Sequence, residues 1–238
     1  MNAQIEGQLS LQERELLTST IRDMPVKPRI VVEVGTWLGG GSTLHILRAL
    51  HENGEGHLWG VEACKDVYEK MITNISAAIP EAAARFTPLF GLSDEVLPGW
   101  LDGLPAGSEI DLAFLDGGDN PLEQIHEFEL LAPRIKTGGV LMGHDARMRK
   151  GKWLCPYVAL LDNWKSQIFD YSHEGLFHAV KTGAQPSETS RRAAARKLRG
   201  MRLEPVELLG SILPGKANET IMRVMPKSLR KMLFKGRR

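Results

Sequence analysis

The stretch that decides the fold is IVVEVGTWLGGGSTLHIL, residues 30–47. It begins as a continuous apolar run rich in β-branched residues, reaches an acid and a glycine, and passes through three consecutive glycines into a helical pattern. Such a run is typical of a buried parallel strand, so the stretch predicts a strand, a glycine-rich turn and a helix. Free backbone N–H groups in a turn of this kind bind an anionic or polar ligand. Tight packing of the chain on itself is the alternative explanation for the glycines.

Strand-like and helix-like segments alternate along the rest of the chain. Further strands are predicted at 57–63, 86–92, 110–116 and 138–145. Helices are predicted from Ser10 to Pro25 and at 42–54, 65–79, 93–101, 120–135 and 155–167. Two last strands lie within 169–182, joined by a turn at Glu174-Gly175, and must run antiparallel because no helix separates them. The pattern predicts an α/β fold, a doubly wound, seven-stranded, mostly parallel sheet with an antiparallel last strand pair.

Two of the predicted helices carry clear start signals. Ser10 with Glu13 three positions later forms a capping box. Asn120 is a predicted N-cap, followed by Pro121 at the first helical position.

Charge is distributed unevenly over the 238 residues. The net charge is only +1, but residues 181–238 carry 15 basic and 4 acidic residues, and the remainder carries 15 basic and 25 acidic. This asymmetry indicates a basic C-terminal segment with its own partner. We therefore expect an N-terminal helix over 1–25, an α/β domain over 26–182 and a basic helical appendage over 183–238.

The cysteines and the hydropathy pattern indicate a cytoplasmic protein. Cys64 and Cys155 lack metal-binding spacing and are expected to be free thiols in a reducing compartment. No secretory signal pattern opens the sequence, and no apolar run approaches the about 20 residues that span a bilayer.

The spacing of the glycines limits the ligand class. They stand at 35, 39, 40 and 41, which fits no register of the dinucleotide fingerprint G-x-G-x-x-G, and no Gly-Lys-Ser/Thr follows as in a phosphate-binding P-loop. The segment VEVGTWLGGGST instead resembles motif I of class I S-adenosylmethionine-dependent methyltransferases. The block FLDGGDNPLEQIHEFELLAPRIKTGGVLMGHD, residues 114–145, resembles the sugar O-methyltransferase and catechol O-methyltransferase-like branch.

The resemblance spans about residues 8–182 and implies a Rossmann-like fold that transfers a methyl group from S-adenosylmethionine to a hydroxyl oxygen of a saccharide or other small molecule. It implies that Glu62 binds the ribose hydroxyls and that Ser93 and Asp94 border the adenine. A solvated strand-end carboxylate at Glu62 and a simple N-cap at Ser93 are the alternatives. The expected cofactor-binding set is Glu33, Gly35, Thr36, Gly39, Gly40, Ser42, Glu62, Ser93, Asp94 and Asp116.

In the metal-dependent branches, acids at the ends of strands four and five hold a divalent cation, which implies that Asp116 and Asp145 bind Mg²⁺. Here Ala146 stands where the catechol-type enzymes have Asn, so one ligand is missing. Asp119 or His144 could replace it, and His144 could instead be the general base. A packed histidine and a turn-forming aspartate are the alternatives. Asp116, His144 and Asp145 are the expected catalytic residues.

Lysines supply the remaining candidates. Lys150 and Lys152 could face an anionic acceptor or lie in a solvated loop.

The C-terminal segment is expected to contact an anionic membrane surface, because Leu229, Met232 and Leu233 lie at helical spacing beneath a basic face. Nucleic acid is less favoured as its partner, because aromatic residues that could stack on bases are scarce there. A solvated helix is the alternative. For the whole chain, a catalytically inactive cofactor-binding protein and an NAD-dependent oxidoreductase are the competing functions.

Overall fold

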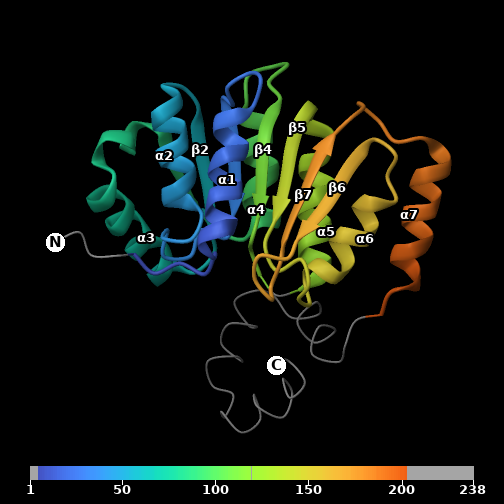
Figure 1. The fold of residues 1–238 in the computed structure, drawn as a ribbon. Helices are drawn as coiled ribbons and strands as arrows, with labels where there is room; N and C mark the ends of the chain where they lie inside the picture. Colours follow the sequence, from blue (N-terminus) through green and yellow to red (C-terminus); the bar gives the residue numbers. More distant parts are fainter. Residues whose placement is uncertain (1–4, 119, 203–238) are drawn as a thin grey trace, which may run out of the picture. The chain divides into compact units, whose positions relative to one another are not determined.

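A central sheet of seven strands organises the chain (Figure 1). The computed structural model describes residues 5–118 and 120–202. The strands are β1 (Ile30–Val34), β2 (His57–Glu62), β3 (Phe86–Phe90), β4 (Ile110–Leu115), β5 (Ile135–Gly143), β6 (Trp164–Phe169) and β7 (Leu176–Lys181). Their order is β3-β2-β1-β4-β5-β7-β6, and β7 runs antiparallel to both β5 and β6 while the other pairs are parallel. The predicted doubly wound sheet with an antiparallel last pair is confirmed.

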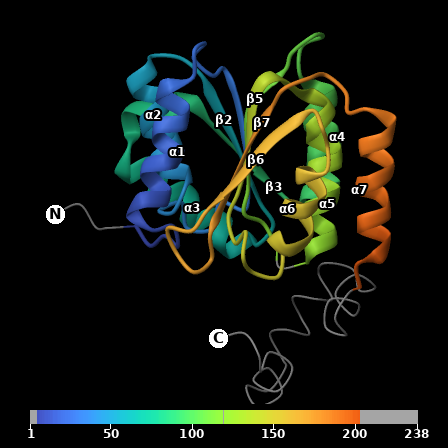
Figure 2. The same cartoon turned by 45° about the vertical axis from the view of Figure 1, so that its right-hand side comes forward.

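Helices cover both faces of this sheet. They are α1 (Leu11–Asp23), α2 (Thr43–Asn53), α3 (Lys65–Ala78), α4 (Ser93–Gly103), α5 (Pro121–Leu131), α6 (Gly151–Ala159) and α7 (Glu188–Gly200), with short 3₁₀ turns at Pro80–Arg85 and Ala132–Arg134. Figure 2 shows α1, α2 and α3 on one side of the sheet and α4, α5 and α6 on the other. The central strands are therefore covered twice, and every residue of β4 is buried.

The helix starts follow the local signals of the sequence. The Ser10 hydroxyl accepts the N–H of Glu13, and the Glu13 carboxylate accepts the N–H of Ser10, so the predicted capping box is present. Asn120 caps α5 by accepting the N–H of Leu122 at 3.0 Å. Gly54 ends α2 in the left-handed conformation that glycine adopts without strain.

One predicted helix, 155–167, has the wrong bounds. Helix α6 starts earlier, at Gly151, and ends at Ala159, and residues from Trp164 onward form β6. The helix ends in 3₁₀-type hydrogen bonds, in which the N–H groups of Leu160 and Leu161 donate to the carbonyls of Tyr157 and Val158. The error arises because a short apolar run fits both the helix period of 3.6 residues and the strand period of 2, so the sequence alone does not separate the two. The first of the two last strands accordingly ends, rather than begins, at Phe169.

Within the appendage predicted to be basic and helical, the structure describes one helix, α7. Asp162 accepts hydrogen bonds from the N–H of Ser187 at 2.8 Å and from the Ser190 hydroxyl at 2.9 Å, which ties the start of α7 to the domain, and Ala194 is buried. The segment around Leu229 lies outside the described residues, so the domain boundaries stay predictions. Among the described helices, none is long and apolar enough to cross a membrane.

Candidate active site

The candidate site lies where β1, β2, β4 and β5 end. In an open α/β sheet, ligands bind at the carboxyl ends of the strands, next to the point where the strand order reverses. That point is here between β1 and β4. Gly35, directly after β1, has φ +87°, and a Cβ on it would lie 2.4 Å from the carbonyl oxygen of Asp116 after β4. Only glycine allows the two strand ends to meet this closely.

Glycine is required at two other positions of the loop for different reasons. Gly39 has φ +86°, which disfavours any other residue. A Cβ on Gly40 would lie 2.3 Å from the carbonyl oxygen of Glu6 and 2.4 Å from that of Ile5, so the N-terminal segment passes directly over this glycine. Packing of the chain on itself therefore explains Gly40, backbone conformation explains Gly39, and both causes apply to Gly35.

Glu33 lies behind the loop. Its side chain is fully buried, and its carboxylate accepts hydrogen bonds from the hydroxyls of Ser42 and, at 2.8 Å, Thr43. Burial raises the pKa of Glu33 to about 8, and the two hydroxyls oppose this rise only in part. Glu33 and Ser42 thus connect β1 to the start of α2, and a direct contact of either with a cofactor stays a prediction.

Glu62 connects the ends of β1 and β2. Its carboxylate accepts the N–H of Trp37 in the glycine loop and the N–H of Cys64, both at 2.9 Å. Trp37 has φ +47°, and its side chain is 37% exposed. A carboxylate has about four acceptor directions, and these two bonds orient Glu62 at the ligand-binding edge.

The remaining predicted cofactor residues differ in their surroundings. Thr36 is buried, and its hydroxyl has no hydrogen-bond partner among the described residues. Ser93 begins α4 and donates to Glu127 at 2.7 Å, and burial raises the pKa of Glu127 to about 7. Asp94 is exposed in the first turn of α4.

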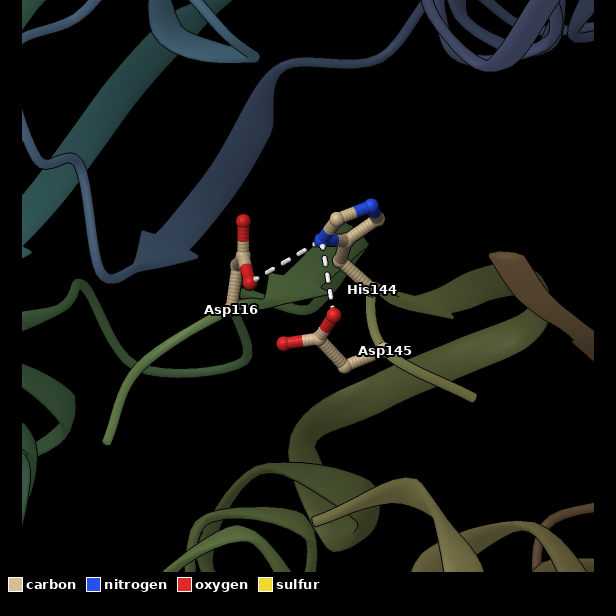
Figure 3. Close-up of side chains that lie close together, drawn as sticks. All are labelled: Asp116, His144 and Asp145. Atoms are coloured by element: carbon tan, nitrogen blue, oxygen red, sulfur yellow. Dashed lines mark ion pairs between the residues drawn. The ribbon is translucent and has the colours of Figure 1, made fainter. Parts of the chain in front are cut away.

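Asp116, His144 and Asp145 converge, as the resemblance implies. His144 Nδ1 lies 3.5 Å from Asp116 Oδ1 and 3.5 Å from Asp145 Oδ1 (Figure 3). One ligand atom from each of the three residues lies within 4.8 Å of the others. Asp145 has φ +59°, an uncommon conformation that aspartate tolerates better than most residues, and it brings this carboxylate to the group. Such strain is often found at functional sites.

Lys150 joins the two acids, whereas the sequence suggested only that it could face an anionic acceptor or lie in a solvated loop. Its ammonium lies 2.7 Å from Asp116 Oδ1 and 3.0 Å from Asp145 Oδ2, and it donates to the carbonyl oxygen of Gly117 at 3.0 Å. Its side chain is only 5% exposed. Lys152, by contrast, is exposed. The one sequence signal for its pairing with the acids is its position in the turn between an acid-ended strand and the next helix.

The charges in this cluster support one another. Burial alone would raise the pKa of Asp116, but Lys150 and His144 outweigh it and hold that pKa below its ordinary value. Burial alone would lower the pKa of His144, but the carboxylates of Asp116, Asp145 and Glu13 raise it. The pKa of Lys150 is raised despite its burial, by the same two aspartates. Lys150 is therefore a permanent positive charge.

Glu13 is a second residue that the sequence placed only as a helix cap. Its Oε2 lies 3.7 Å from His144 Nε2, and its Oε1 accepts the hydroxyl of Ser172 at 2.6 Å. The start of α1, the end of β5 and the turn before β7 thus meet behind His144, whose side chain is 2% exposed. Asp119 lies outside the described residues, and its proposed metal role stays a prediction.

Comparison with known proteins agrees with this architecture. Residues 32–146 match a family model described as a methyltransferase domain, and these residues hold the glycine loop, Glu62 and the acid cluster. Over these residues the chain is similar to the methyltransferase domains that the model describes. Comparison with curated protein sequences gives no significant match.

Three solved structures illustrate the shared fold. The O-methyltransferase TomG from Streptomyces achromogenes, involved in tomaymycin synthesis and solved in complex with SAM, is 19% identical, with a TM-score of 0.61 over 74% of this chain and 82% of that one. An O-methyltransferase from Bacillus cereus in complex with SAH is 19% identical, with a TM-score of 0.61 over 74% and 83%. A methyltransferase from Geobacter sulfurreducens is 15% identical, with a TM-score of 0.58 over 74% and 80%. At these identities, the similarity shows the fold.

Proposed function

We propose that this protein transfers the methyl group of S-adenosylmethionine to a hydroxyl oxygen of a saccharide or other small molecule. The observation that carries the proposal is the hydrogen bond from the N–H of Trp37 to Glu62, which joins the ends of β1 and β2 into one ligand-binding edge. The acid cluster lies next to this edge, because Gly35 contacts the backbone of Asp116. Two structural neighbours are O-methyltransferases solved with SAM or SAH.

The two halves of the site have separate tasks. Glu62 would accept hydrogen bonds from the ribose hydroxyls, and the glycine loop would let the cofactor approach the backbone. Asp116 and Asp145 would face the acceptor. In such a transfer the acceptor oxygen would bond to the methyl carbon as the carbon–sulfur bond breaks, sulfur would keep the electron pair, and the hydroxyl proton would pass to a base, such as the predicted base His144, or to water. Alignment of the two reactants is the main contribution that the protein can make.

His144 fits a positioning role within this cluster. It is almost fully buried, with Asp116 and Asp145 on one ring nitrogen and Glu13 on the other. In this place His144 would help to keep the two aspartates together. The general-base role that the sequence suggested for His144 stays a prediction.

Cofactor binding is tested by thermal shift with S-adenosylhomocysteine on wild type and Glu62→Ala, with Glu69→Ala as the control because Glu69 is an exposed glutamate on α3. A ligand at about 100 times its Kd adds about 2.7 kcal/mol of stability. We expect a shift of several degrees in wild type and Glu69→Ala, strongly reduced in Glu62→Ala. No shift in wild type at millimolar ligand would refute the proposal, and a shift with NAD alone would favour the oxidoreductase.

Transfer is tested separately with labelled S-adenosylmethionine and a panel of hydroxyl acceptors. Label on a saccharide or phenol would support O-methylation. Binding of S-adenosylhomocysteine with no transfer across the panel would favour the inactive cofactor-binding protein.

A further inference from the structure

The acid cluster resembles a metal site but contains a cation of its own. Asp116, His144 and Asp145 could each offer a ligand to a divalent ion. Position 146 offers only the methyl group of a buried alanine. Lys150 Nζ lies within hydrogen-bond distance of both carboxylates. A divalent ion held by these two oxygens at 2.0–2.6 Å would compete with the ammonium for the same charge. As they stand, the residues do not fit the metal.

The ammonium of Lys150 is fully satisfied where it lies. A lysine has three N–H donors, and three oxygens surround this one: Asp116 Oδ1, Asp145 Oδ2 and the carbonyl of Gly117. A surface lysine that samples many rotamers would not be buried against three acceptors.

The loop that carries Lys150 is built to hold it there. A Cβ on Gly151 would lie 2.5 Å from the carbonyl oxygen of Asp145, so only glycine allows the chain to fold back at this point. The N–H of Met148 donates to the backbone carbonyl oxygen of Asp145 at 2.9 Å. The N–H groups of Ala146 and Arg147 donate to the carbonyls of Gly175 and Glu174 at 3.0 and 2.7 Å, which ties the loop to the turn before β7.

We propose that Lys150 is the built-in cation of this site and replaces the divalent metal of metal-dependent methyltransferases with the same fold. The charge that holds Asp116 and Asp145 together is thereby covalently part of the chain. Lys150 is a positioning residue for the two aspartates. If the proposed methyl transfer is correct, that transfer needs no added metal, and this last clause alone rests on the proposed function.

The test measures Mn²⁺ binding directly on EDTA-treated protein. Binding is detected by calorimetry and by the loss of the EPR signal of free Mn²⁺. Wild type, Lys150→Arg and the control Lys152→Ala are expected to bind Mn²⁺ weakly or not at all. Lys150→Ala and Lys150→Gln leave the carboxylates without their cation and are expected to bind Mn²⁺ at least about tenfold more tightly. The Lys150→Arg variant separates the effect of charge from that of shape.

Tight Mn²⁺ binding by wild type would overturn the inference, and so would unchanged Mn²⁺ binding in both Lys150→Ala and Lys150→Gln. Circular dichroism shows whether each variant is folded, and the wild-type measurement decides the first outcome without any variant. The S-adenosylhomocysteine shift is recorded on the same samples. Its absence alongside the expected Mn²⁺ pattern would refute the methyltransferase proposal but not the role of Lys150.

Discussion

At the residue scale, two buried ionisable groups in this site differ in their charge state. Lys150 stays charged because two aspartates surround it, whereas Glu33 has only hydroxyls as partners and resists ionisation. Burying a charge is costly unless it is paired, so the two residues should respond differently to substitution and to pH.

Lys150→Ala should destabilise the metal-free protein by about 3 kcal/mol, because removing one partner of a buried ion pair leaves uncompensated charge. The Lys152 side chain is exposed, so Lys152→Ala should change the free energy of unfolding by less than about 0.5 kcal/mol. Urea denaturation in EDTA at neutral pH measures both. Equal, small effects would show that the Lys150 ion pairs contribute little.

Glu33 should make stability decrease as the pH rises. Its folded-state pKa, about 8, lies above the ordinary value of 4.5, so the folded state binds the proton more tightly. This contribution is fully present below about pH 4.5 and is lost as the pH rises to about 8, at up to about 1.4 kcal/mol per pH unit. Glu33→Gln cannot ionise and should show a flatter dependence of Tm on pH between 5 and 8. Parallel curves for the two proteins would contradict this assignment.

At the element scale, the N-terminal segment and the glycine loop depend on each other. Gly40→Ala would place a methyl group 2.3–2.4 Å from the backbone of Ile5 and Glu6. The change should cost about 1–3 kcal/mol, as overpacking usually does. In a chain that lacks residues 1–7 the obstacle is gone, so the same substitution should cost much less there.

Gly99→Ala in α4 is the matched control for this experiment. A Cβ on Gly99 meets no atom within 4 Å, and alanine favours helix, so this change should be neutral or slightly stabilising. Chemical denaturation of wild type, Gly40→Ala, the shortened chain and the shortened chain with Gly40→Ala measures the coupling between Gly40 and the N-terminal segment, with Gly99→Ala as the control. An identical cost of Gly40→Ala in the full and shortened chains would show that the loop, not the N-terminal segment, restricts this position.

At the scale of the whole molecule, the basic C-terminal segment remains a proposed contact with an anionic membrane surface. Residues 203–238 carry eight basic and three acidic residues. Each Lys or Arg near anionic headgroups contributes about 1 kcal/mol. The full chain should co-sediment with phosphatidylserine vesicles, and less so as salt rises, whereas a chain ending at Arg202 should bind less.

That truncation retains α7, which Asp162 holds at its start. Phosphatidylcholine vesicles are the control for charge. Equal co-sedimentation of the two chains would remove this segment as the membrane contact.

The sequence predicted most of the fold and part of the site. Ser10, Asn120 and Gly54 act through neighbours within a few residues, so local chemistry sets these helix ends. The acids at 62, 116 and 145 lie at or just after the ends of strands that must meet at one edge of a parallel sheet. The bounds of α6 and β6 escaped prediction because their short apolar run fits both periods.

Only the tertiary structure decided which charges meet. Lys150 contacts Asp116 across 34 positions of the chain, and Ser172 contacts Glu13 across 159. Periodicity and capping carry no information about such pairs, because they depend on how the turns after β4, β5 and β6 pack together. By itself, the sequence therefore determined a methyltransferase-like sheet with acids at its edge. The folded chain decided that Lys150 lies between those acids, because the turn after β5 brings its ammonium to both carboxylates.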